Sequence, residues 1–169
     1  MENVKNGLNG PMIKWDLCSG NPKEGESQAE GYLHHDVNPK IEGLDLCCNL
    51  LDIDKHIDKG SVGEILLSHA LEHFTIPESK KVLKMLFKLL KTDGKLTIIV
   101  PNFRWHAKLL LEGHEEEANY YCFGGQLDEF DLHKQGFTPN RLKNLLQEAG
   151  FALLSCDDES SITCISIKP

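Results

Sequence analysis

Several features that define other protein classes are missing from this sequence of 169 residues. Its apolar runs are far shorter than the roughly 20 residues that span a bilayer, and MENVKNGLNG at its start has no apolar core like that of a signal peptide. The six cysteines form no C-x-x-C pair, so neither a disulfide framework nor a zinc ribbon is expected. We therefore predict a cytoplasmic protein with reduced cysteines and no membrane partner.

Basic charge is also scarce. The chain has 18 Lys and Arg against 26 Asp and Glu, a net charge of −8, so electrostatic binding to nucleic acid is not expected. Its length and its 40% hydrophobic content fit one globular domain over residues 1–169. The composition is compatible with a monomer or a homodimer.

Short apolar runs alternate with helical patterns, which is typical of an α/β sheet. Thr75 to Glu78 is a capping signal and predicts a helix over 78–91. Thr138-Pro139 is a second one and predicts a helix over 139–149, which ends at Gly150. The chain closes with two runs around an acidic turn, 151–156 and 162–167, which we predict to be an antiparallel pair. The expected parallel strands are 12–20, 31–36, 44–50, 63–68 and 95–101.

The stretch SHALEHF, residues 68–74, contains H-x-x-E-H, a zinc signature of certain metallopeptidases. That signature needs both histidines on one face of a helix. A strand over 63–68 is favoured instead, because the stretch has Gly63 and the Leu66-Leu67 pair and lacks a cap that would start a helix. A right-handed crossover through helix 78–91 then makes this strand the neighbour of 95–101, and the motif lies at the edge where open α/β sheets bind ligands. We expect no metal, and the zinc peptidase remains a minor alternative.

Three further strand ends carry small or polar residues. DLCSG, residues 16–20, permits a sharp turn against a cofactor, although strand ends also carry glycine for a plain turn. Asp36 ends the second strand, where an acid usually binds ribose hydroxyls, but it could equally start the turn into Asn38-Pro39. Asn49 could pair with an adenine edge or simply form a turn.

Taken in order, DLCSG, HHD, CCNL, LLSHALEHF and KLLKTDGKLTIIVP resemble the class I S-adenosylmethionine-dependent methyltransferases. The segment 124–151 also resembles a small subgroup of that family, so the likeness covers nearly the whole chain. It implies a doubly wound, mostly parallel Rossmann-like sheet, with S-adenosylmethionine as the cofactor.

The resemblance also implies roles for individual residues. Asp16, Cys18, Ser19 and Gly20 would hold the methionine end of the cofactor, and Asp36 would hold its ribose. The other implied contacts are Asn49 and Leu50 around the adenine, and Ser68, His69 and Ala70 beside the sulfonium.

The sequence departs from the family at several points. Cys18 replaces a glycine, Asn49 replaces an aspartate, and Thr92-Asp93 replaces Pro-Gly. Too few residues separate Asp36 from Leu44 for the usual crossover helix, and a helix after DLCSG must fit within 23–30. This trimmed N-terminal half leaves a non-catalytic or vestigial binding module as an alternative.

Two histidines are candidate general bases, because a histidine near neutral pKa can deprotonate a hydroxyl acceptor. His73 follows the fourth strand, and His133 lies in DLHKQGF with Asp131 two residues before it. Each could also have a purely structural role. His106 and His114 are expected to be solvated, and His34 and His35 to be structural.

The segment 102–137 follows the fifth strand, so it lies on the ligand edge, where long connections are often lids. We predict a substrate lid, although 109–123 could instead be an ordinary helix that covers the sheet. The predicted function is methyl transfer from S-adenosylmethionine to a small-molecule or sugar-like acceptor. The candidate acceptor contacts are Arg104, Trp105, Tyr120, Tyr121 and Gln126.

Overall fold

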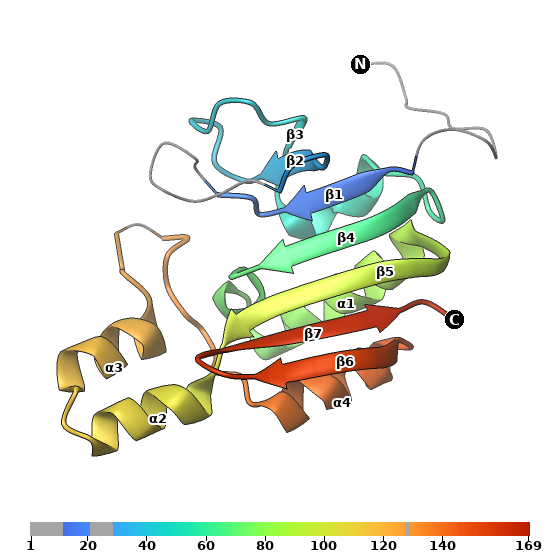
Figure 1. Cartoon of the computed structure of the whole chain (residues 1–169). Helices are drawn as coiled ribbons and strands as arrows, with labels where there is room; N and C mark the ends of the chain where they lie inside the picture. Colours follow the sequence, from blue (N-terminus) through green and yellow to red (C-terminus); the bar gives the residue numbers. More distant parts are fainter. Residues whose placement is uncertain (1–11, 21–28, 128) are drawn as a thin grey trace.

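The structure, a computed structural model, describes residues 12–20, 29–127 and 129–169. These residues form a seven-stranded sheet in the order β3-β2-β1-β4-β5-β7-β6 (Figure 1). All strand pairs are parallel except those of β7, which runs antiparallel to both β5 and β6. This confirms the predicted doubly wound sheet with an antiparallel pair at its C-terminal edge. The strands are β1 Lys14–Leu17, β2 Leu33–Asp36, β3 Leu46–Cys47, β4 Val62–Ser68, β5 Leu90–Pro101, β6 Ala152–Asp158 and β7 Ser161–Ile167.

The helices divide into two groups. α1 (Ile76–Leu89) and α4 (Pro139–Ala149) lie side by side against one face of the sheet, and the 3₁₀ helix η2 (Leu50–Lys55) packs beside α1. The second group, α2 (Phe103–Leu111) and α3 (Glu115–Phe123), extends beyond the end of the sheet at which the parallel strands terminate (Figure 1). None of the described helices is long and apolar enough to cross a membrane.

The connection from β4 to β5 through α1 forms the centre of the core. The Glu78 carboxylate accepts hydrogen bonds from the backbone N and the hydroxyl of Thr75, which fixes the first turn as predicted. Val82, Leu83 and Leu86 recur at helical spacing and are fully buried, and each such side chain stabilises the fold by about 1.5–3 kcal/mol. The helix ends at Leu89, two residues earlier than predicted, because the chain enters β5 at Leu90.

The N-terminal edge of the sheet is trimmed, as expected. No helix separates β2 from β3, and the stretch 37–45 is an irregular loop. A parallel connection must return the chain to the start of the next strand. Because β3 has only two residues, this return covers only a few ångströms, and a loop without a helix can make it. The helix predicted within 23–30 falls mostly on residues 21–28, which lie outside the described residues.

The three N-terminal strands are shorter than predicted. β1 covers four residues of the predicted 12–20, because the backbone turns left-handed at Cys18 (φ 56°). The predicted strand 44–50 was wrong at its C-terminal end. There Asn49 caps η2, and its side chain accepts a hydrogen bond from the backbone N of Leu51 at 2.9 Å.

A network of charged groups lies on β1, β4 and β5. Glu64 of β4 is buried and forms ion pairs with Lys14 (3.2 Å) and with Lys95. Burial alone would raise the pKa of Glu64, but hydrogen bonds from Lys95, Tyr32 and Lys14 outweigh it and lower the pKa. The carboxylate therefore links three neighbouring strands in its ionised form.

Replacing Glu64 with Gln should lower the free energy of unfolding at pH 7 by about 1.5–3 kcal/mol, the usual value of hydrogen bonds to a charged group. A carboxylate with a depressed folded-state pKa stabilises the protein above its unfolded value of about 4.3, and that contribution is lost as pH falls through the lower folded value. Urea unfolding at pH 7 and below pH 4 should show the difference disappear in acid. The exposed Glu30→Gln is the control, and an equal loss at both pH values would contradict this account.

Candidate active site

The turn after β1 is tightly folded and anchored to β2. Cys18 and Gly20 both have positive φ, at 56° and 67°, a conformation that favours glycine. Cys18 thus adopts a left-handed backbone although it is not a glycine. The backbone N of Ser19 donates to the carbonyl of His35 at 2.9 Å, and that of Cys18 donates to the imidazole of His35 at 3.3 Å.

Two buried carboxylates lie beside this turn. Asp36, at the end of β2, accepts hydrogen bonds from the backbone N of Gly20 at 3.2 Å and of Asn38 at 2.9 Å. Asp16 accepts one from Ala29 N at 3.0 Å, and burial raises its pKa, against smaller opposing effects of Ala29 and His34. Asp36, the predicted ribose contact, is thus hydrogen-bonded directly to the predicted cofactor turn at Gly20.

The residues at the end of β3 differ from one another. Asn49 is exposed, and its side-chain oxygen caps η2, while Leu50 is 2% exposed and packs in the core. Leu50 therefore offers almost no side-chain surface to a ligand, and Asn49 is the better candidate for an adenine contact.

The end of β4 excludes the helical zinc motif. Ser68 ends the strand, and His69 takes a left-handed φ of 47° with its backbone N donating to Ile99 O at 2.8 Å. Only Leu71–His73 form a short 3₁₀ turn, η3. His69 and His73 therefore share no helix face, and the metallopeptidase alternative is wrong. The prediction that Ser68 to Ala70 lie at a strand end is confirmed.

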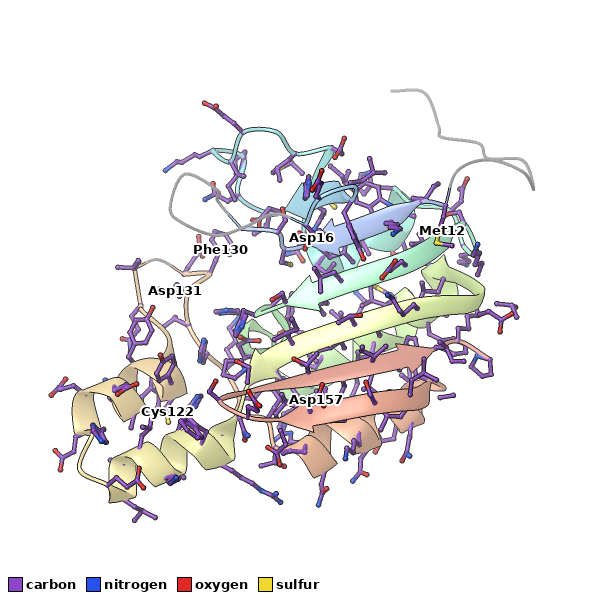
Figure 2. All side chains as sticks on the ribbon, viewed as in Figure 1. Met12, Asp16, Cys122, Phe130, Asp131 and Asp157 are labelled. Atoms are coloured by element: carbon purple, nitrogen blue, oxygen red, sulfur yellow. The ribbon has the colours of Figure 1, made fainter. Side chains whose placement is uncertain are left out.

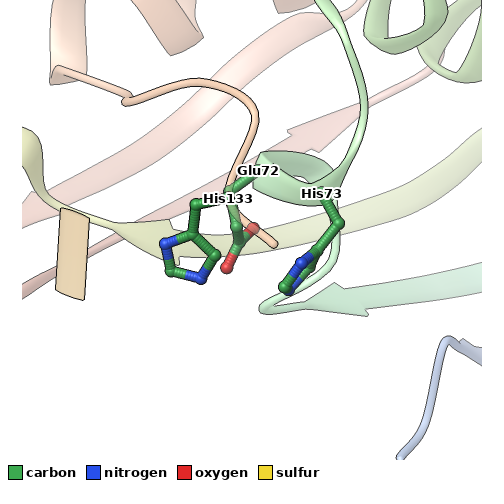
Figure 3. A group of neighbouring side chains, drawn as sticks. All are labelled: Glu72, His73 and His133. Carbon is green, nitrogen blue, oxygen red and sulfur yellow. The ribbon is translucent and has the colours of Figure 1, made fainter. Parts of the chain in front are cut away.

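Three side chains meet at η3, two of them from η3 itself, and Figure 3 shows the Glu72 carboxylate next to the rings of His73 and His133. The two rings are 4.9 Å apart between centroids. One ligand-type atom from each residue lies within 4.8 Å of the others. The structure thus brings together the two predicted histidines, and it adds Glu72.

The hydrogen bonds of both histidines define their tautomers. Nδ1 of His73 lies 3.2 Å from Leu132 O, and Nδ1 of His133 lies 2.9 Å from Tyr121 O. A carbonyl only accepts, so Nδ1 carries a proton in each ring, and in the neutral form of either ring the lone pair lies on Nε2. Burial lowers the pKa of His133, against a smaller opposing effect of Glu72, which favours the neutral ring.

The segment after β5 forms the helical pair α2–α3 rather than a helix that covers the sheet. His106, expected to be solvated, is instead buried at 3% exposure and stacks on Tyr121 with 5.1 Å between ring centroids. That expectation was wrong because the burial comes from a contact between two helices, which the residues next to His106 do not reveal. Backbone bonds from His133 N to Phe123 O (3.1 Å) and from Lys134 N to Glu72 O (2.8 Å) tie the end of α3 and the following loop to η3.

Most of the exposed large apolar side chains belong to this pair of helices and the loop behind it. Figure 2 shows this part of the chain beside the sheet, with Phe130 and Asp131 on the loop. All five predicted acceptor contacts are exposed: Arg104 and Trp105 on α2, Tyr120 and Tyr121 on α3, and Gln126 in the loop. The exposed apolar residues there are Phe103, Trp105, Leu110, Leu111, Tyr120, Tyr121, Phe123, Leu127, Phe130 and Leu132.

With this geometry in place, the family of the chain can be established. The family described as "Methyltransferase domain" matches residues 29–156, well over half of the chain. The chain belongs to this family, the class I S-adenosylmethionine-dependent methyltransferases, and S-adenosylmethionine is the family's cofactor. No curated protein matches the sequence significantly.

Solved structures show the same fold at low sequence identity. A SAM-dependent methyltransferase from Archaeoglobus fulgidus is similar with a TM-score of 0.65 and 16% identity, over 95% of this chain and 88% of that one. A SAM-dependent methyltransferase from Methanosarcina mazei is similar with a TM-score of 0.64 and 16% identity, over 95% of this chain and 94% of that one. The third structure is the 1,6-didemethyltoxoflavin-N1-methyltransferase of Burkholderia thailandensis with bound 1,6-didemethyltoxoflavin and S-adenosylhomocysteine. Its TM-score is 0.62 and its identity 16%, over 95% of this chain and 72% of that one.

Two residues that sequence reasoning missed organise this site. Glu72 looked like part of a turn, and its burial to 1% exposure has no local signal. Gln135 donates to Phe74 O at 2.9 Å and to the hydroxyl of Ser79 at 2.5 Å, and it accepts from Arg141 at 2.6 Å. It joins the loop after α3 to η3, α1 and α4, contacts that only the tertiary fold creates.

Replacing Gln135 with Ala should lower the free energy of unfolding by about 1–3 kcal/mol, because it leaves partly buried partners without their hydrogen bonds. Urea unfolding measures the change, with the exposed Gln147→Ala on α4 as the control. A loss no larger than that of the control would show that Gln135 does not anchor the loop.

Proposed function

We propose that this protein transfers a methyl group from S-adenosylmethionine to a small-molecule or sugar-like acceptor. The observation that carries the proposal is the joined pair of strand ends at β1 and β2. There the left-handed turn at Cys18–Gly20 and the buried Asp36 are held together by the bond from Gly20 N to the carboxylate.

This donor set suits the cofactor. A turn with positive φ exposes backbone groups for close approach, and Asp36, although it accepts two backbone bonds, keeps further lone pairs for ribose hydroxyls. Burial raises the pKa of Asp16, and a ligand with cationic ammonium and sulfonium groups nearby would favour its ionised form. Cys18 and Ser19 would contact the methionine end, Asn49 the adenine, and Ser68, His69 and Ala70 the sulfonium side.

Bound at this edge, the cofactor would supply a methyl group on a good leaving group. The protein's own contribution is then to place the acceptor atom in line with the methyl group and the sulfur. Such positioning can lower the barrier to methyl transfer by about 7–11 kcal/mol. The aromatic surface of α2 and α3 supports an acceptor site there, with Trp105, Tyr120 and Tyr121 as stacking partners and Arg104 and Gln126 as polar ones. His73 and His133 are the candidate catalytic groups at this edge.

A second candidate function is a binding module without turnover. It is favoured by the loop 37–45, which stands where a crossover helix is usual. With a loop in this place, fewer residues surround the proposed cofactor site. The two functions separate in one experiment, in which labelled S-adenosylmethionine is incubated with the protein and a panel of hydroxyl, amine and thiol acceptors. Label in any product supports the transferase, while cofactor binding with no label in any acceptor supports the module.

Asp36→Ala should weaken the binding of S-adenosylhomocysteine roughly ten- to a hundredfold, the loss expected for hydrogen bonds to a charged group. Titration calorimetry measures the affinity. The control is Asp45→Ala, which also removes a carboxylate that accepts a backbone bond, from His34 N at 2.8 Å, but is exposed and away from the edge. If both variants bind as the wild type does, Asp36 does not hold the ribose.

A further inference from the structure

Glu72 is an anomaly among the buried charges of the described residues. It is 1% exposed, and neither of its carboxylate oxygens has a hydrogen-bond partner within the part of the chain that the structure describes. Nδ1 of His69 lies 3.7 Å from Oε1 of Glu72, within ion-pair range for a protonated ring but beyond hydrogen-bond distance. A buried carboxylate without hydrogen-bond partners costs several kcal/mol, and a bound cation would offset that cost.

The two histidines beside Glu72 are prepared as ligands. His73 and His133 each donate Nδ1–H to a backbone carbonyl, from Leu132 and from Tyr121. Metal-binding histidines typically make this bond, because it fixes the ring and leaves the lone pair of Nε2 for the ion. Both rings lie next to the Glu72 carboxylate (Figure 3).

We propose that Glu72, His73 and His133 form a binding site for a divalent transition-metal ion of the zinc class. Two imidazoles and one carboxylate are a donor set that such ions take, whereas Mg²⁺ and Ca²⁺ prefer all-oxygen sites. Bonds of about 2.0–2.2 Å place two ligands up to about 4.4 Å apart across an ion. Because the three ligand atoms already lie within 4.8 Å of one another, small side-chain rotations complete the site.

The proposed site differs from the H-x-x-E-H signature in its ligands and in its consequence. Its third ligand comes from the loop after α3, 60 positions beyond His73 in the printed sequence. A bound ion would therefore fasten this loop to η3, next to the strand end at Ser68, and three protein ligands would leave coordination positions open to small molecules.

The test is zinc binding by the full-length protein without cofactor, so its outcome is independent of the proposed methyl transfer. After removal of metal with a chelator and dialysis, titration calorimetry with Zn²⁺ should show one ion per chain. Zn²⁺ should also raise the melting temperature, because it binds the folded state. Co²⁺ in its place should give a visible absorption spectrum that reports its ligands.

His133→Asn and Glu72→Gln should each weaken Zn²⁺ binding about tenfold or more, and His133→Asn should abolish the Co²⁺ spectrum. The matched control is His114→Asn, which replaces an exposed histidine at the start of α3 with a good N-cap residue. His133 lies on a loop, so this variant should keep the wild-type circular dichroism even if Glu72→Gln unfolds. No stoichiometric zinc in the wild type, or equal affinity in wild type and His133→Asn, would overturn the proposal. Binding of Mg²⁺ as tight as that of Zn²⁺ would do the same.

Discussion

The structure depends on one constraint, the right-handed crossover that takes the chain from β4 through α1 to β5. Because the two strands are parallel, their carboxyl ends lie at the same edge of the sheet. The crossover therefore fixes where the turn 68–74 and the segment after Pro101 emerge. Burial of α1 residues such as Val82 and Leu83 against the sheet holds this arrangement in place. The candidate cofactor contacts, the histidine pair and the helices α2 and α3 all lie at the edge that it creates.

The fold could be predicted from the sequence because its signals are local. The capping residues around Thr75 and Thr138, the buried periodicity of α1 and the small residues after β1 each act within a few positions. Their order resembled a family pattern, from which we expected departures at Cys18 and Asn49. Cys18 still adopts the glycine-like backbone, and Asn49 is used as a helix cap.

Contacts between distant segments could not be predicted in the same way. His106 is buried because α3 folds back and stacks Tyr121 on it, a contact that the residues next to His106 do not reveal. Gln135 and Glu72 have no local pattern at all, since their surroundings come from η3, α1 and the loop after α3. The boundaries of β3 also depend on tertiary structure, because a two-residue strand is defined only by its pairing with β2.

Function at this edge combines two proposals. Cofactor binding rests on the ends of β1 and β2, and metal binding rests on Glu72 with the histidine pair that the first proposal uses as candidate catalytic groups. The central claim is the first. It is tested most directly by a crystal structure of the protein grown with S-adenosylhomocysteine. We predict that the ribose contacts Asp36 and that the sulfur faces Ser68 to Ala70, with the open side toward α2 and α3. A ligand bound elsewhere on the molecule, or none at saturating concentration, would contradict the account.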